Sequence, residues 1–181
     1  MGQYYKIALK SDSDNKIRFN NRKVEGIDYT MAKLMEHSYF GVPLMDSVAK
    51  VLEDSPTKLI WVGDYAKDEE IKQITTDEVG YDDVWKTNHD DDVLDNVKFD
   101  YNGKFLVNYD KKLWVSLDRC MSSKDEINPI SILTCIGNGR GGGDYHGSFM
   151  EYVGTWGWDK IGITSSVPEC FTELQVTFKE G

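Results

Sequence analysis

Residues 64–100 restrict the fold of this chain more than any other stretch, because they combine dense negative charge with few apolar side chains. The window holds 13 acidic and four basic residues, a net charge of −9 out of −10 for the whole chain. Such a segment cannot supply the main hydrophobic core, so we expect helical turns and loops that are loosely anchored. Its negative field favours basic partner surfaces and repels nucleic acid and anionic membranes.

The rest of the chain is nearly neutral and can build a core. Hydrophobic residues make up 40% of the sequence and aromatic residues 12%, which is typical of a folded domain. We expect one domain over residues 1–181, with an acidic, loop-rich segment at about 64–96. The net charge of −10 argues against direct nucleic-acid binding. No apolar run approaches the roughly 20 residues that span a membrane, so we expect no membrane partner.

The three cysteines, Cys120, Cys135 and Cys170, are widely spaced and form no Cys-x-x-Cys motif. An odd number of cysteines, with no signal peptide in the sequence, favours reduced thiols and a cytoplasmic location. We expect each cysteine to be a small buried apolar side chain rather than a nucleophile.

Strands and one helix are predicted in the first third of the chain. Residues 3–9 and 16–19 are rich in Tyr, Ile and Phe, which favour strands. Residues 43–54 combine a first-turn proline, Pro43, with one apolar stripe at helical spacing, so we expect a helix. The apolar run at residues 58–62 is typical of a buried strand.

In the second half of the chain, apolar residues recur with period two from residue 96. Asn102-Gly103 is typical of a type I′ hairpin turn, so residues 96–117 are predicted to form an antiparallel meander that first turns there. The sequence therefore predicts the α+β class, with a mainly antiparallel sheet, a hairpin meander and one or two packed helices. Further strands are predicted at residues 131–136, 151–156, 160–164 and 173–178.

A glycine-rich loop spans residues 137–147, where six of eleven residues are glycine. One interpretation is a tight connection that needs positive φ angles. The alternative is a small-molecule or nucleotide-binding loop, in which successive backbone N–H groups form an anion nest and nearby Trp156 and Trp158 line the same end. A Rossmann loop does not fit, because no helical pattern follows. The candidate ligand-binding residues are Asn138, Gly139, Arg140, Gly141, Gly142, Gly143, Asp144, Tyr145 and His146.

No motif indicates catalysis, a cofactor or a metal site. His89-Asp90 and the run Asp90-Asp91-Asp92 lack the spacing and context of known metal sites, and a solvated acidic loop explains them better. A third hypothesis is an enzyme of unknown class. In that case Asp144 and His146 form the polar pair to test. We expect a non-enzymatic protein without a cofactor.

Three stretches resemble a group of uncharacterised proteins from bacteriophages and Gram-positive bacteria: residues 1–6 (MGQYYK), 34–40 (LMEHSYF) and 137–145 (GNGRGGGDY). This resemblance implies no chemistry by itself. In size and charge the chain is also similar to phage anti-CRISPR and anti-restriction proteins, many of which present carboxylates to the nucleic-acid-binding groove of a host nuclease. A phage-encoded protein of this kind would act in the host cytoplasm.

The charge and this resemblance together favour a non-enzymatic inhibitor of a host nucleic-acid-processing defence system. The most concrete form is an anti-CRISPR protein that acts as a DNA mimic and binds a Cas9-type effector, or its ribonucleoprotein complex, at a basic groove. Such binding should weaken steeply with salt, whereas a ligand held in the glycine loop should not respond in this way. The expected partner contacts are Asp82, Asp83, Asp90, Asp91, Asp92 and Asp95.

Overall fold

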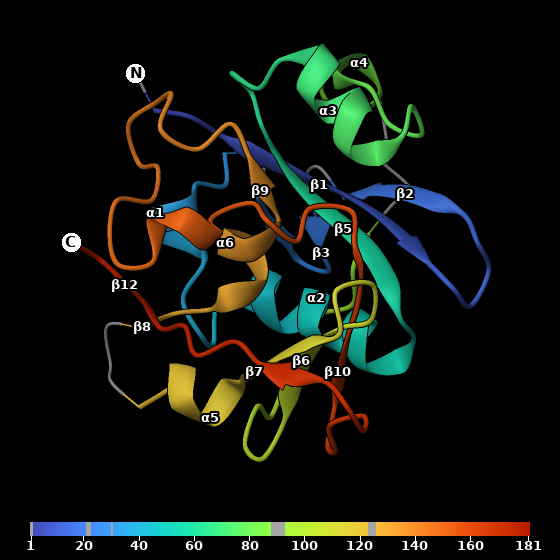
Figure 1. Cartoon of the computed structure of the whole chain (residues 1–181). Coiled ribbons are helices and arrows are strands. Elements are labelled where there is room, and N and C mark those ends of the chain that lie inside the picture. The colour runs from blue at the N-terminus through green and yellow to red at the C-terminus, as the bar shows by residue number, and fades with distance from the viewer. Residues whose placement is uncertain (1, 21–22, 30, 88–92, 123–125) are drawn as a thin grey trace.

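A mainly antiparallel β-sheet runs through the centre of the molecule (Figure 1), in a computed structural model that describes residues 2–20, 23–29, 31–87, 93–122 and 126–181. The strand order is β11-β7-β6-β10-β5-β1-β2. Two strands pair with the same edge of β5: β10 pairs with the first residues of β5, and β9 pairs with its last residues. The strands of this sheet are β1 (Tyr5–Ser11), β2 (Ile17–Asn20), β5 (Thr57–Gly63), β6 (Phe105–Asn108), β7 (Leu113–Ser116), β9 (Cys135–Ile136), β10 (Lys160–Thr164) and β11 (Thr172–Glu173).

Two small sheets and several helices complete the described part of the chain. The small sheets pair β3 (Lys23–Val24) with β4 (Ile27–Asp28), and β8 (Glu126–Ile127) with β12 (Phe178–Lys179). The helices are α1 (Leu34–His37), α2 (Pro43–Asp54), α3 (Asp68–Thr75), α4 (Tyr81–Trp85), α5 (Leu117–Cys120), α6 (Pro129–Thr134) and the 3-10 helix η1 (Met150–Tyr152).

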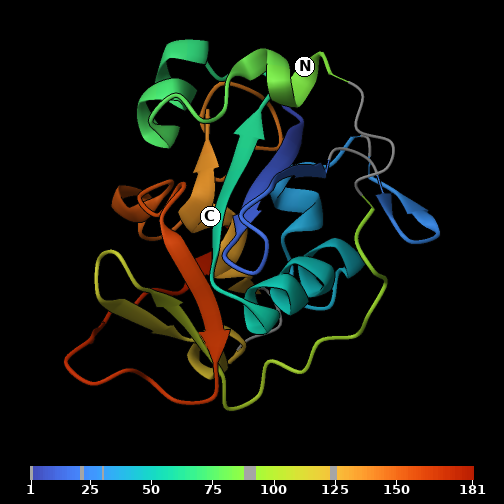
Figure 2. The same cartoon turned by 90° about the vertical axis from the view of Figure 1, so that its right-hand side faces the viewer.

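Both faces of the central strands are buried. Along β5, Leu59 and Trp61 enter the larger core with α2 and α6, whereas Ile60 and Val62 enter a smaller core with α3 and α4. Helix α2 and the α3–α4 pair therefore lie on opposite faces of the sheet, as Figure 2 shows. This arrangement follows from the continuous apolar run of β5, since a strand exposed on one face would alternate apolar and polar residues.

The predicted fold class is confirmed, together with the elements that have the clearest local patterns. The predicted helix at residues 43–54 is α2, with Pro43 in its first turn and Leu44, Val48 and Leu52 buried. The strands predicted near residues 3–9, 16–19, 58–62 and 160–164 are β1, β2, β5 and β10. The antiparallel neighbours β7, β6 and β10 include the β6–β7 hairpin.

The predicted first strand of the meander is wrong. Residues 97–101 form no strand; they belong to an extended segment that runs along the side of the molecule in Figure 2. At the predicted hairpin turn, Gly103 has a φ of +69° but Asn102 does not have a positive φ. A type I′ turn needs positive φ at both residues, so this turn has the pattern of type II. The backbone N–H of Lys104 donates to the carbonyl of Tyr101 at 3.2 Å and closes the turn, but the turn joins no pair of strands. The hydroxyl of Tyr101 instead donates to the carboxylate of Asp46 on α2, at 2.9 Å.

Three other predicted strands are wholly or partly wrong. The apolar run at residues 131–136 is mostly helix α6, which starts where the side chain of Asn128 accepts a hydrogen bond from the backbone of Ile130. Residues 151–156 form η1 and turns whose N–H groups, at Gly154 and Trp156, donate to carbonyls in the last turn of α6. In the segment 173–178, only the first and last residues, Glu173 and Phe178, belong to strands.

Within residues 68–85 of the acidic segment, α3 and α4 provide the expected helical turns, but the prediction of loose anchoring is wrong there. Ile71 of α3, Val84 of α4 and Val79 in the connection between these helices are each fully buried against the sheet. On the same side, the ammonium group of Lys6 lies 4.4 Å from the centre of the Trp85 ring, a cation–π contact between β1 and α4. A few well-placed apolar residues are therefore enough to fix residues 68–85 in place.

Candidate functional site

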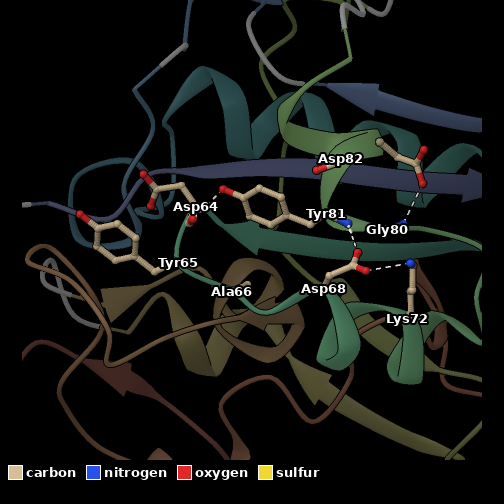
Figure 3. A pocket seen from close by; sticks show the side chains of 9 residues that line it. Asp64, Tyr65, Ala66, Asp68, Lys72, Gly80, Tyr81 and Asp82 are labelled. Atoms are coloured by element: carbon tan, nitrogen blue, oxygen red, sulfur yellow. Dashed lines mark hydrogen bonds and ion pairs between the residues drawn. The ribbon is translucent and has the colours of Figure 1, made fainter.

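The candidate site is a cleft in the acidic segment, which we call the acidic cleft, with a volume of about 490 Å³. It opens where β5 ends and the chain turns into α3 and α4 (Figure 3). Four aspartates contribute to its lining, against one lysine, Lys72. The cleft is lined by Asp64, Tyr65, Ala66, Asp68, Lys72, Gly80, Tyr81, Asp82 and Asp83.

The starts of two helices bring the aspartates together. Asp68 begins α3, and Asp82 and Asp83 lie in the first turn of α4. Acidic side chains stabilise this end of a helix, where the backbone N–H groups are unpaired. The Asp83 carboxylate accepts a hydrogen bond from the backbone N–H of Gly80 at 2.7 Å, which fixes the start of α4.

Asp68 links the two helices across the cleft. One carboxylate oxygen accepts from the backbone N–H of Tyr81 at 2.7 Å, and the other lies 2.7 Å from the ammonium group of Lys72. Its hydrogen bond to Lys72 lowers the pKa of Asp68, so this carboxylate stays ionised. The Tyr81 hydroxyl donates to the backbone carbonyl of Asp64 at 2.7 Å, which ties α4 to the end of β5.

The carboxylates of Asp64 and Asp82 have different hydrogen-bond partners and different exposure. The Asp64 carboxylate accepts from the backbone N–H of Tyr4 at 3.1 Å, and partial burial raises its pKa. The Asp82 side chain is 70% exposed and pairs with Lys86, which is equally exposed, at 2.9 Å. An ion pair this exposed contributes little to stability, so Asp82 is free to meet another cation.

The chemistry of this cleft suits a cation. Carboxylate oxygens are hydrogen-bond acceptors for ammonium and guanidinium groups, and the rings of Tyr65 and Tyr81 add faces for cation–π contact. Within the residues that the structure describes, no group of three or more His, Cys, Asp or Glu side chains could hold a metal ion.

The predicted partner contacts are only partly brought together. Asp82 and Asp83 line the acidic cleft, whereas Asp95 is exposed beside α2, where its carbonyl accepts from the Ser47 hydroxyl at 2.6 Å. Asp90, Asp91 and Asp92 lie outside the described residues. Sequence reasoning missed Asp64, Asp68 and the two tyrosines as parts of one site. Their signal was their position directly after a buried strand and at helix starts.

The glycine loop has the expected backbone but a different role. Gly137, Gly139 and Gly143 have positive φ angles, and much of the loop is accessible, as predicted. The anion nest is present, but the Asp144 carboxylate fills it. One oxygen of Asp144 accepts from the backbone N–H groups of Gly139, Arg140 and Gly141 at 2.7, 2.9 and 3.0 Å. Its other oxygen accepts from the Tyr5 hydroxyl at 2.9 Å.

The side chains expected to contact a ligand are also engaged. The Arg140 guanidinium contacts both carboxylate oxygens of Glu70 on α3 at 2.7 and 2.8 Å. Tyr145 is fully buried and its hydroxyl donates to the carbonyl of Ser148, so its ring is not available for stacking. Trp156 and Trp158 are buried as well and do not line the loop surface. The expected ligand contacts by Tyr145, Trp156 and Trp158 are therefore wrong.

The remaining loop residues hold the chain together. The Asn138 side chain bonds both backbone groups of Tyr145, and the carbonyls of Gly142 and Gly143 accept from Gln3 and Met35. The two residues of the predicted polar pair lie in different environments, because Asp144 is buried and His146 is exposed.

The loop encloses Gln3, which lies just before β1. A methyl group on Gly141 would lie 2.5 Å from the Cβ atom of Gln3, and one on Gly63 would lie 2.0 Å from its amide nitrogen. These glycines allow the backbone to close around Gln3, which is fully buried. The structural interpretation of the loop therefore accounts for the glycines that lie against Gln3.

Two further expectations concern the cysteines and the membrane. Cys120, Cys135 and Cys170 are all free, but only the first two are buried, so the prediction for Cys170 is wrong. Among the residues described, no helix has the length and apolar character needed to cross a membrane.

Comparison of the chain with protein-family models, curated proteins and solved structures gave no match.

Proposed function

We propose that this protein is a non-enzymatic binding protein that presents the acidic cleft and the surrounding carboxylates to a basic groove of a nucleic-acid-processing protein. A Cas9-type effector in complex with its guide RNA, of the kind that phage anti-CRISPR proteins inhibit, is the most concrete partner. Its channel holds nucleic acid through basic side chains, so clustered carboxylates can compete for the same surface.

The observation that carries this proposal is the preorganised acidic cleft. The carboxylates of Asp64, Asp68 and Asp83 accept hydrogen bonds from backbone N–H groups, and Asp82 lies in the first turn of α4. A rigid acidic surface loses little conformational entropy on binding, and its field accelerates association with a basic partner. The one cationic side chain in the lining, Lys72, is already paired with Asp68.

The alternative of a small-molecule binder has less support. An incoming anion at the glycine loop would have to displace the Asp144 carboxylate from three backbone N–H groups. It would also have to break the contact of Arg140 with Glu70. Both changes expose or unpair charged groups, which costs more than a surface nest can return.

The test is inhibition of DNA cleavage by a Cas9–guide complex at low and moderate salt. The test variant is Glu69→Gln/Asp82→Asn, in which both carboxylates are exposed and only Asp82 has an ion pair among the described residues. The matched control is Glu36→Gln/Glu169→Gln, which removes the same charge elsewhere. In this control Glu36 pairs with Lys33 at 3.0 Å, and Glu169 is exposed without a described partner.

We expect the parent and the control to inhibit cleavage and the test variant to bind about tenfold more weakly, mainly through slower association. The difference should shrink as salt is added. Equal inhibition by test and control variants would show that the acidic cleft is not the contact surface. If the parent itself neither binds nor inhibits at low salt, this class of partner is wrong.

A further inference from the structure

The turn at residues 101–104 carries a chemically labile pair, Asn102-Gly103. In the sequence, only Asn102 and Asn138 are asparagines followed by glycine. A backbone nitrogen can attack the side-chain carbonyl carbon of the preceding asparagine, which makes asparagine thermolabile. Glycine hinders this attack least because it has no side chain. Since both pairs contain the same reacting atoms, their surroundings in the fold decide which of them reacts.

The surroundings of Asn102 leave it open to this reaction. Asn102 and Gly103 are both exposed, and a methyl group on Gly103 would meet no atom within 4 Å. The Asn102 side-chain nitrogen donates to the Asp100 carboxylate at 2.8 Å, and the Gly103 N–H donates to the Asp118 carboxylate at 3.0 Å. Both acceptors are themselves exposed, so water can replace either hydrogen bond at little cost. The Asn102 side chain can therefore turn toward the Gly103 nitrogen.

The surroundings of Asn138 oppose the same rotation. Its side-chain nitrogen donates to the carbonyl of Tyr145 at 3.0 Å, and its side-chain oxygen accepts from the Tyr145 N–H at 2.7 Å. Tyr145 is fully buried, so rotation of Asn138 would leave two buried backbone groups unpaired. The nitrogen of Gly139 donates to the buried carboxylate of Asp144 at 2.7 Å, which also holds it back from the attack. The fold therefore protects this second pair.

We propose that Asn102 is a site of spontaneous deamidation in the folded protein, with the Gly103 nitrogen as the nucleophile and water as the co-reactant. The Gly103 nitrogen loses its proton and bonds to Cγ of Asn102, which closes a five-membered succinimide ring. The bond from Cγ to Nδ2 breaks, and Nδ2 leaves with that proton as ammonia. Water then opens the ring at either carbonyl carbon and yields aspartate or isoaspartate, with no change of oxidation state. This inference is independent of the proposed partner.

The reaction would alter a turn that is tied to α2 on both sides. The hydroxyl of Tyr101 donates to the carboxylate of Asp46 at 2.9 Å, and the ammonium group of Lys104 lies 2.7 Å from the carboxylate of Glu53. Both carboxylates belong to α2. Isoaspartate adds a methylene group to the backbone between these two contacts. Either product also places a negative charge beside the carboxylate that now accepts from the Asn102 side chain, and like charges repel. The reacted turn therefore holds α2 less firmly.

The experiment follows both asparagines in the full-length chain. The folded protein is incubated in mildly alkaline buffer made with water enriched in heavy oxygen, which enters the product when the ring opens. Trypsin, used afterwards in ordinary water, releases residues 99–104 and 125–140, one peptide for each asparagine–glycine pair. Mass spectrometry then measures the heavy oxygen in each peptide. The control is the same chain unfolded in guanidinium chloride, where the fold protects neither pair. The variant Gly103→Ala adds a methyl group to the attacking residue, and the fold has room for it.

In the folded chain we expect Asn102 to incorporate heavy oxygen at least about tenfold faster than Asn138. In guanidinium chloride the two rates should converge. Gly103→Ala should strongly slow the reaction of Asn102 and leave that of Asn138 unchanged. Equal rates at the two asparagines of the folded chain would overturn the proposal, as would an Asn102 that reacts only when the chain is unfolded. A rate at Asn102 that Gly103→Ala does not reduce would refute Gly103 as the nucleophile.

Discussion

Lys10 and Lys58 lie directly opposite each other on the antiparallel strands β1 and β5, and both contact the carboxylate of Glu78. Like charges at directly opposed positions destabilise a sheet, so this pair needs a counter-charge. Glu78 also accepts a hydrogen bond from the indole nitrogen of Trp158 at 3.2 Å. Part of the acidic segment is therefore structural, because Glu78 fastens the segment after α3 to the sheet.

The first prediction concerns the stability contributed by Glu78. We expect Glu78→Gln to lower the free energy of unfolding by about 1–2 kcal/mol, because it leaves two lysines without their shared partner. The control Glu69→Gln should change it by less than about 0.5 kcal/mol, since Glu69 is exposed and unpaired among the described residues. Chemical denaturation measures both values. Equal values for the two variants would contradict the structural role of Glu78.

The second prediction concerns pH. The hydrogen bond from Lys10 is the main cause that lowers the pKa of Glu78 from 4.5 to about 2. Because the pKa is lower in the folded chain, this group contributes stability that is fully present above about pH 4.5 and is lost as the pH falls toward 2. Melting temperatures between pH 6 and 2 should therefore fall more steeply for the parent than for Glu78→Gln. Parallel curves would argue against this carboxylate as a source of acid sensitivity.

The third prediction concerns the filled nest of the glycine loop. Asp144→Ala leaves three backbone N–H groups and the Tyr5 hydroxyl without their acceptor, so we expect a loss of about 3 kcal/mol. Tyr5→Phe removes only one donor and should cost about 1 kcal/mol. Acetate should restore part of the melting temperature of Asp144→Ala, because its carboxylate fits the vacated nest, and should not affect the parent. A lack of rescue together with a small loss would show that the nest contributes little.

The fourth prediction compares two glycines of the same loop. In Gly141→Ala the added methyl group would lie 2.8 Å from the backbone nitrogen of Gln3, so the backbone just before β1 must shift. In Gly139→Ala the methyl group meets no atom within 4 Å, and only the positive φ of 88° is unfavourable. We expect Gly141→Ala to speed hydrogen exchange at the Gln3 amide, which donates to Gly142, and Gly139→Ala to leave it protected. The opposite ranking would rule out the close approach.

The elements that sequence analysis placed correctly are those whose pattern is local. The apolar stripe and first-turn proline of α2 need no tertiary contact to be recognised, and the apolar run of β5 has the length of a strand. The turn at Asn102-Gly103 failed because its type depends on where the neighbouring segment packs, and Tyr101 is held by Asp46 on α2. The apolar run at residues 131–136 has the length of a strand, but Asn128 caps a helix that begins at Pro129, and this capping decides between the two.

The candidate site was predictable in its charge but not in its shape. Dense like charges must face solvent, which is why Asp82 and Asp83 were correctly expected at the surface. The acidic cleft itself forms only when the end of β5 meets the start of α4 through the Tyr81 hydroxyl. In the glycine loop, the filling of the nest by Asp144 depends on a fold-back of a few residues that composition does not reveal.

The enclosure of Gln3 by the glycine loop also has a consequence for folding during synthesis. Gln3 lies just before strand β1, and the residues that cover it, 137–142, are synthesised more than 130 residues later. Its partner β5 likewise receives β9 and β10 from the last third of the chain. Contacts this distant in sequence slow folding. The nascent chain must therefore keep an incomplete sheet, with one edge of β5 still open, until β9 and β10 have been translated.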